Sequence, residues 1–245
     1  MHKSFFEKWK YFLREIAIVV IGVLLAFILN SWWLNVKEAR SNRILLSSLE
    51  EELKSNQAQL METKRIHEFV LRNTLELESL LHSVDPGQNI NIPDTIMAGS
   101  IIAATFNPAS GIIESFLAST ERGAVGVNEL VTLVASWRYL YEDVAEDEQT
   151  GFDLVETQLI PFLRNQVDLS MILTDLGKWA RYARTADLQD NIAPAFLQHS
   201  QPVQSGLEIR NLIAQRKMRL GITIGAMQRL EKLQEQVLAL IKIHV

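Results

Sequence analysis

The sequence predicts an all-α protein in which an N-terminal transmembrane helix continues into a long helix, followed by an elongated extramembrane helical bundle. Three observations predict this fold. An apolar run fills residues 15–34, and residues 35–84 contain neither Pro nor Gly. Over the whole chain, Gly and Pro number only 11 and 6 of 245 residues, whereas a sheet with many turns needs more of both. The residues after the apolar run are numerous enough for one domain with its own core.

The apolar run has the length and flanks of a membrane span. From Ile16 to Leu34 it measures roughly 28 Å as an α-helix, close to the ~30 Å hydrocarbon core of a bilayer. Trp32 and Trp33 suit the membrane–water interface, where the ring faces lipid and its N–H faces water. A buried core helix is the alternative. It does not account for β-branched residues on all faces between charged and aromatic flanks.

The polar and small residues of the span lie on one helical face, because they are spaced seven, four and four residues apart. We call this set the span face: Glu15, Gly22, Ala26 and Asn30. Gly22 and Ala26 form a small-x-x-x-small pair that lets another backbone approach closely. We hypothesise that the span face packs against another transmembrane helix, most simply a second copy of the chain. The alternative is that Glu15 and Asn30 only reach the two interfaces.

The segment after the span predicts one long helix that reaches about Val84 and stops at Asp85-Pro86-Gly87. Steps of three and four residues through it meet twelve positions, of which eight are apolar, and this pattern favours an amphipathic helix with an imperfect coiled-coil seam. The seam consists of Leu46, Leu49, Leu53, Asn56, Leu60, Thr63, His67, Val70, Thr74, Leu77, Leu81 and Val84.

The rest of the chain predicts shorter helices and one further long helix. They are expected at residues 95–105, 112–119, 128–163, 168–184 and 205–243. Asp94, Ser110 and Asn128 are the predicted caps of the first three. Pro161 predicts a kink, and Ser205 with Glu208 predicts a capping box. Residues 88–93, 107–111, 120–127 and 185–202 are expected to be loops or turns. The first and last helices of this bundle are expected to be antiparallel.

Composition excludes several classes of function. The chain has no Cys, so disulfides, zinc–thiolate sites and thiol nucleophiles are excluded. The net charge is −5, and no strongly basic segment lies beyond the flanks of the span. Nucleic acid is therefore not expected as a partner.

The N-terminal part resembles a bacterial family of small single-pass membrane proteins with a domain of unknown function. The resemblance rests on a Glu-Ile pair, a Val-Val-Ile-Gly run, an Ala, and an Asn just before a Trp. These residues are Glu15, Ile16, Val19, Val20, Ile21, Gly22, Ala26, Asn30 and Trp32. Weaker matches are 105–108, 115–119 and 128–130, with Thr120 where the family usually has Gly. The resemblance implies membrane anchoring and a helical extramembrane domain, and it implies no activity.

Flanking charge sets the expected topology. Four Lys or Arg residues precede the span and three follow it, which favours a cytoplasmic N-terminus. We therefore divide the chain into a short cytoplasmic N-terminus (1–14), a transmembrane helix (15–34) and a helical, coiled-coil-like extramembrane domain (35–245). This domain is expected on the periplasmic side of a bacterial inner membrane. A cleaved signal peptide is the competitor, but no A-x-A-like site follows the apolar run.

The sequence contains no evident catalytic, cofactor-binding or metal-binding motif. The five His residues have no H-x-x-x-H or H-E-x-x-H spacing, so neither a metal site nor a cofactor nor a catalytic residue is predicted. Carboxylates cluster at Glu142, Asp143, Glu146, Asp147 and Glu148. One turn apart, such groups can bind Ca²⁺ or Mg²⁺. The favoured interpretation is a solvated acidic helix end that faces Arg210, Arg216, Lys217 and Arg219.

Two further groups of residues can be interpreted as packing or as binding features. Gly221 and Gly225 fall within a helical pattern and predict close helix packing. Four aromatic residues are interpreted as core residues rather than as the lining of a ligand cavity: Trp137, Trp179, Tyr182 and Phe196.

The sequence therefore favours a non-enzymatic, membrane-anchored helical protein. It is expected to contact the lipid bilayer and to act by self-association as a homo-oligomer, through the transmembrane and following helix, or by scaffolding a membrane-protein partner at the periplasmic face. A sensor-like bundle that binds a small molecule between helices is the alternative. A membrane-bound hydrolase is a third class, which no local motif supports.

Overall fold

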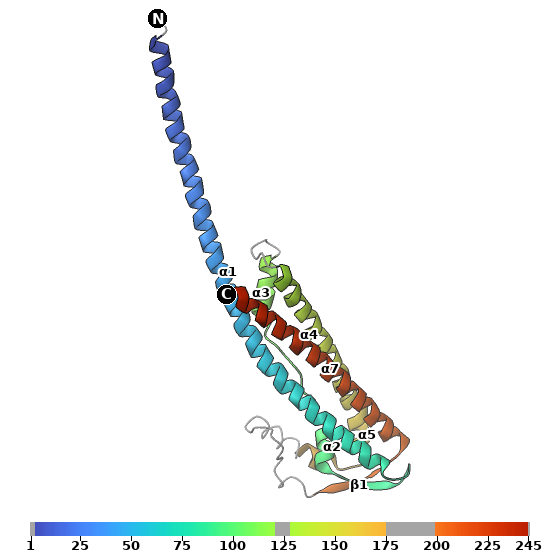
Figure 1. Cartoon of the computed structure of the whole chain (residues 1–245). Helices are drawn as coiled ribbons and strands as arrows, with labels where there is room; N and C mark the ends of the chain where they lie inside the picture. The colour runs from blue at the N-terminus through green and yellow to red at the C-terminus, as the bar shows by residue number, and fades with distance from the viewer. Residues whose placement is uncertain (1–2, 121–127, 175–198, 245) are drawn as a thin grey trace.

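The computed structural model describes residues 3–120, 128–174 and 199–244, and it confirms the predicted all-α fold apart from one small β-ribbon (Figure 1). Its first helix, α1 (Lys3–His82), runs for 80 residues. The N-terminal half of α1 stands apart from the bundle, and its C-terminal half lies against it (Figure 1). The helix predicted to reach about Val84 thus ends two residues earlier.

The seam is the buried face of α1. Eleven of its twelve residues are buried, and Val84 is half-buried. The contacts are made inside the chain, because α1 packs on α7 (Leu207–His244), α2 (Asp94–Ile101) and α3 (Gly111–Thr120). The amphipathic helix is therefore confirmed. A coiled coil with another chain stays a prediction, and this chain's own bundle already covers the seam.

The bundle is completed by α4 (Asn128–Leu154), which packs along α7. Two ion pairs join α1 to α7: Lys64 with Glu231, and Glu78 with Lys217 at 2.6 Å. The second pair lies 14 residues later than the first on α1, at 78 against 64. On α7 it lies 14 residues earlier, at 217 against 231. The two helices are therefore antiparallel, as expected.

A two-stranded antiparallel ribbon lies at the end of the bundle farthest from the N-terminus (Figure 1). It pairs β1 (Asn89–Pro93) with β2 (Ser200–Gln204), with Ile90 opposite Val203. The prediction of loops at 88–93 and 185–202 is therefore wrong for residues 89–93 and 200–202, which form strands. The alternation Asn-Ile-Asn-Ile in β1 is the period-two pattern of a half-buried strand, and Ile92 is fully buried.

Three predicted helix boundaries need correction. The helix predicted at 95–105 ends at Ile101, because Ile102 is extended (φ −60°, ψ 136°). Asp94 is the first residue of α2 rather than its cap, which is Pro93. The capping box is not formed, since the Ser205 hydroxyl donates to Leu81 O at 2.6 Å and so joins the end of α1 to the start of α7.

After α4, the helix continues through a π-helical turn, η1 (Val155–Leu159), into α5 (Ile160–Arg164). The N–H of Ile160 donates to Val155 O, five residues back. The kink predicted at Pro161 is thus a widened turn just before the proline. Residues 169–174 are helical and Asp168 caps them, because its Oδ1 accepts from Ser170 N at 2.9 Å. The rest of the helix predicted at 168–184 lies outside the described residues.

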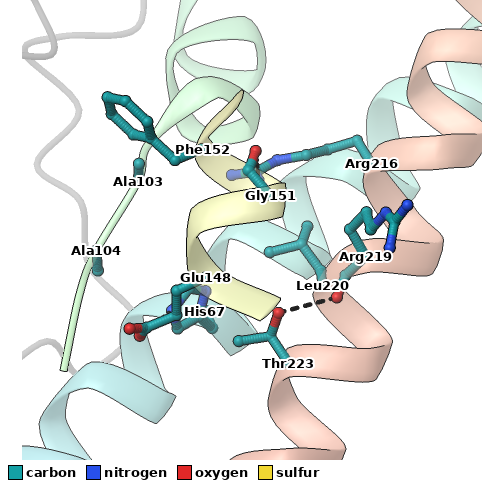
Figure 2. Close-up of a pocket in the computed structure, with 10 residues that line it drawn as sticks. All are labelled: His67, Ala103, Ala104, Glu148, Gly151, Phe152, Arg216, Arg219, Leu220 and Thr223. Carbon is teal, nitrogen blue, oxygen red and sulfur yellow. Dashed lines mark hydrogen bonds and ion pairs between the residues drawn. The ribbon is translucent and has the colours of Figure 1, made fainter. Parts of the chain in front are cut away.

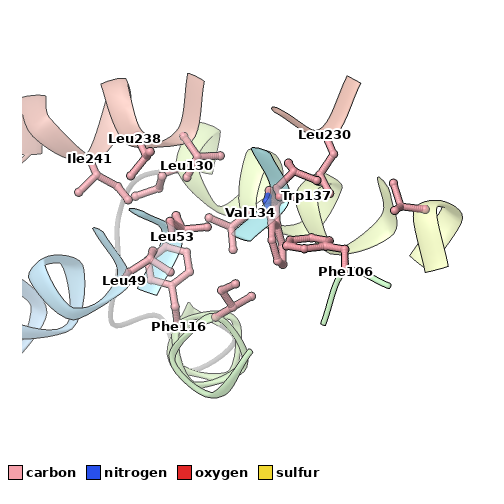
Figure 3. Packing of buried hydrophobic residues seen from close by; sticks show 14 of the residues in the cluster. Leu49, Leu53, Phe106, Phe116, Leu130, Val134, Trp137, Leu230, Leu238 and Ile241 are labelled. Carbon is pink, nitrogen blue, oxygen red and sulfur yellow. The ribbon is translucent and has the colours of Figure 1, made fainter. Parts of the chain in front are cut away.

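The bundle has two large apolar cores and a small third one, which consists of Val70, Ile102 and Leu220. The near core lies toward the N-terminal half of α1 and includes Leu49, Leu53, Phe116, Trp137 and Leu238 (Figure 3). The far core includes Leu77, Met97, Leu159 and Ile213. Each such buried side chain contributes about 1.5–3 kcal/mol. Between the two cores lies a layer of buried polar residues, to which the candidate site belongs.

Candidate functional site

The span face is open in the folded chain. The described N-terminal part contains one helix long and apolar enough to cross a membrane, and none of its apolar window is buried. Glu15, Gly22, Ala26 and Asn30 are all exposed, and a Cβ placed on Gly22 would meet no atom within 4 Å. The structure thus leaves this face free for a contact outside the fold.

The second candidate feature is the non-helical connector between α2 and α3, residues 102–110. It has few backbone partners of its own, and buried backbone groups need hydrogen bonds. Side chains from all three long helices supply them. We call this arrangement the clamp, and its members are Glu52 and Asn56 of α1, Glu148 of α4 and Arg216 of α7.

Arg216 holds the start of the connector. The residue is 3% exposed, and its guanidinium donates to three backbone carbonyls: Ile102 O at 2.6 Å, Gly151 O at 3.1 Å and Ser100 O at 3.3 Å. Burial lowers the pKa of Arg216 to about 10. The planar fork of an arginine suits this role, because its donors diverge in one plane. One side chain thereby ties α7 to α2, the connector and α4.

Glu148 holds the middle of the connector. Both carboxylate oxygens accept from the backbone N–H of Phe106, at 3.0 and 3.1 Å. His67 Nε2 lies 3.2 Å from Glu148 Oε1, so the ring N–H donates to the same carboxylate. Both residues are 5% exposed. A charged acceptor gives stronger bonds than a neutral one, which favours a fixed position for Phe106 in the near core.

Asn56 and Glu52 hold the end of the connector. Asn56 forms a paired contact with Ala109, accepting from its N–H at 2.9 Å and donating to its carbonyl at 2.7 Å. Glu52 accepts from the N–H groups of Ile112 and Ile113 and so caps α3. The cap predicted at Ser110 is therefore supplied by another helix. A carboxylate at a helix N-terminus is favourable, because the free N–H groups carry partial positive charge.

A small cavity lies within the clamp, beside His67, Glu148, Arg216 and Thr223 (Figure 2). Its volume is about 10 Å³. This is enough for about one water molecule and far below the ~300–1,000 Å³ of small-molecule sites. The His–Glu pair therefore fixes the fold and has no room for a substrate. Within the described residues no group of three or more His, Asp or Glu is placed to hold a metal ion.

The acidic cluster is not the uniformly solvated helix end that the sequence predicts. Glu148 is buried in the clamp, whereas Glu142 and Asp143 are exposed. Desolvation raises the pKa of Asp147, and the charges of Arg229 and Arg219 oppose this. Arg219 therefore does face the cluster, as predicted.

The other three predicted basic partners have different contacts. Lys217 pairs with Glu78, Arg216 binds carbonyls, and Arg210 donates to Leu81 O and Val84 O at 2.8 Å. These contacts tie α7 to α1 and to the connector instead of to the acidic cluster.

The remaining sequence candidates divide into packed, open and undescribed positions. Trp137 is a core residue, and its Nε1–H donates to Gln234 at 3.0 Å. Gly221 is exposed, and a Cβ placed on it would meet no atom within 4 Å, so the predicted close packing there is wrong. Trp179, Tyr182 and Phe196 lie outside the described residues.

Comparison with known proteins identifies a family without a known role. A family model described as a family of unknown function (DUF6090) matches residues 15–147, which is more than half of the chain. The chain therefore belongs to this family. The matched range contains the span face, the seam and the connector, and it ends one residue before Glu148. The comparisons with curated proteins and with solved structures each returned no match.

Proposed function

We propose that this family member is a single-pass membrane protein of the bacterial inner membrane that associates with itself through the span face. Residues 1–14 are cytoplasmic, residues 15–34 cross the bilayer, and the bundle lies on the periplasmic side. The protein is non-enzymatic and acts by presenting its bundle at a fixed distance from the membrane, either to a second copy or to a membrane-protein partner.

One observation supports this proposal above the others. The chain covers the seam with its own bundle but leaves the span face bare. A second helix that met the seam would have to displace α7, whereas a helix that meets Gly22 and Ala26 displaces only lipid. Because lipid tails are as apolar as the span, association there depends on close backbone approach and on hydrogen bonds. Gly22 and Asn30 offer one of each.

The continuity of α1 supports the anchoring part of the proposal. From Lys3 to His82 the helix contains one glycine and no proline, so no hinge residue separates the proposed span from the bundle. A partner held by the span is therefore held at a defined position relative to the bundle.

The oligomeric mass of the full-length protein in mild detergent tests the self-association. Multi-angle light scattering is expected to give more than one chain for the wild type. Gly22→Ile combined with Ala26→Ile is expected to give one chain. The matched control, Val20→Phe with Leu24→Phe, adds bulk to the opposite face and leaves the mass unchanged. A wild-type monomer, or the same mass for the Gly22/Ala26 variant, would contradict the proposal.

Reporter fusions test the proposed topology. A reporter that is active only in the periplasm, fused after residue 245, is expected to be active, and one that is active only in the cytoplasm is expected to be silent. The reversed result would place the bundle in the cytoplasm. The thin charge bias, four basic residues against three, makes this a necessary measurement.

A further inference from the structure

We propose that the end of the bundle farthest from the span carries a binding cleft for a neutral saccharide, between the η1–α5 segment and the first turns of α7. The cleft has a volume of about 420 Å³ and is shallow and widely open to solvent. This volume lies within the ~300–1,000 Å³ range of small-molecule sites. The inference goes beyond the proposed self-association, because the cleft lies at the opposite end of the molecule from the span face.

The wall of the cleft is formed where the backbone departs from regular α-helix. In η1 the Ile160 N–H donates five residues back to Val155 O, and the widened turn carries exposed side chains at Thr157 and Gln158. π-Helical turns are rare and are frequently found at functional sites. Both residues line the cleft, so the irregular turn and the cleft are the same place in the fold.

The polar groups of the lining are free for a ligand. The side-chain amides of Gln158, Asn165 and Gln166 and the carboxylate of Glu208 line the cleft. Within the described residues, none of these four side chains takes part in a hydrogen bond or an ion pair. Each amide offers two donors and one acceptor oxygen side by side. Adjacent hydroxyls of a sugar ring, each both donor and acceptor, match that arrangement.

The floor of the cleft is apolar. Among the lining residues, Pro161 and Phe162 are half-buried and Leu212 is buried. An aromatic ring carries a negative face that attracts weakly positive C–H groups. A sugar has such a C–H face on one side of its ring and hydroxyls at its edge. The combination of an aromatic floor and an amide rim therefore suits a saccharide better than a purely apolar ligand.

Charge narrows the class of ligand. Glu208 is the one charged residue of the lining, and no Lys, Arg or His among the described residues lines the cleft. A phosphate or carboxylate ligand would meet a like charge without a cation to offset it. A neutral polyhydroxylated ligand meets no such penalty. A small organic cation is the competing class, because Glu208 and Phe162 would attract it, and the experiment separates the two.

The test uses the full-length protein in a zwitterionic detergent without sugar headgroups, because a glycosidic detergent would occupy the cleft. Glucose, N-acetylglucosamine and their β-1,4-linked disaccharides are titrated, and binding is measured by calorimetry and by saturation-transfer NMR. At least one is expected to bind with a Kd in the ~μM–mM range. Choline is titrated as the cationic probe and is expected to bind more weakly.

Variants locate the binding. Gln158→Ala changes an exposed side chain and is expected to weaken binding by about tenfold or more. Phe162→Ala is expected to weaken it similarly, and its melting curve shows whether the half-buried site still folds. Gln215→Ala removes an exposed amide of α7 outside the cleft and is expected to leave the Kd unchanged.

Three results would overturn the proposal: no saccharide binds, Gln158→Ala binds as the wild type does, or choline binds more tightly than every saccharide. Oligomeric mass is measured on the same samples. A failure of saccharide binding is therefore distinguishable from a failure of self-association.

Discussion

The two halves of α1 differ more in their surroundings than in their backbone. In the first half, Leu24 and Phe27 are 54% and 65% exposed, and their apolar neighbours occupy every side of the helix. In the second half, Leu53 and Leu60 are almost wholly buried, and apolar residues follow the seam. One continuous helix thus has a first part long and apolar enough to cross a membrane and a second part that packs against the bundle. The distribution of apolar residues around the axis, rather than their number, distinguishes a lipid environment from a protein one.

The difference teaches where the stability of the molecule lies. The bundle half is fixed by two cores and by the clamp, all within one chain. In the first half, all described side chains of residues 14–41 are exposed. Changes in the clamp should therefore alter folding, and changes in the bare half should alter association or membrane insertion. Four changes test this division, from the largest expected effect to the smallest.

Arg216→Ala should destabilise the bundle most. It leaves three backbone carbonyls without their donor, at about 1–3 kcal/mol for each buried group. A loss of about 3–5 kcal/mol in the free energy of unfolding is expected in urea titrations followed by circular dichroism. Arg219→Ala, the control on the same helix, should cost less than ~1 kcal/mol. A loss below ~1 kcal/mol for Arg216→Ala would mean that the connector is held in another way.

Glu148→Gln should have a smaller effect. The amide keeps one acceptor oxygen for Phe106 N but loses the charge that strengthens the bond, so a loss of about 1–2 kcal/mol is expected. A double-mutant cycle with His67→Phe should give a coupling energy of about 0.5–1.5 kcal/mol. Additive losses would show that the 3.2 Å contact between His67 and Glu148 contributes nothing of its own.

Asp147→Asn should be nearly neutral and should depend on pH. Because burial raises the folded-state pKa of Asp147 above its ordinary value, the ionised form is disfavoured in the folded state. The penalty is absent below pH ~3.8, where the unfolded chain is also protonated, and present above the folded-state pKa. The variant should therefore gain up to ~0.5 kcal/mol at about pH 7 and nothing at about pH 3. A loss at neutral pH would show that Arg229 and Arg219 outweigh desolvation.

Deleting residues 1–40 should change the unfolding free energy least. No described side chain before residue 42 is buried or half-buried, so the bundle loses no packing, and a change within ~0.5 kcal/mol is expected. The shortened protein should also leave the detergent phase in a phase-partition assay. A loss of several kcal/mol in the free energy of unfolding would show that the first half of α1 also stabilises the bundle.

Local periodicity explains what the sequence could predict. The seam, the long helices and α3 all follow from apolar spacing, because that spacing is a property of each segment alone. The β-ribbon was missed because five-residue strands between polar stretches resemble loops. The alternation in Asn89 to Ile92 was the available signal.

The clamp was missed for a different reason. Glu148 and Arg216 belong to residue types that are almost never fully buried without partners, so the sequence placed both at the surface. Their burial depends on the connector, whose unpaired backbone groups lie more than 40 residues away from either. The useful signal was Pro108 within a stretch that cannot continue a helix, since such a stretch needs hydrogen-bond partners from elsewhere. Nothing in the local pattern indicates which side chains supply them.

The packing of α7 against α1 also bears on the distance between the proposed span and the bundle. Ile241, near the end of α7, belongs to the same core as Leu46 and Leu49, which are the first buried residues of α1. The exposed neck between the proposed span and the bundle is residues 35–41, a length of roughly 10 Å as an α-helix. Phe116 of α3 and Leu130 of α4 belong to the same core, so three segments besides α1 close this end of the bundle. The distance between the proposed span and the bundle is thus fixed by segments that lie far from the span in the sequence.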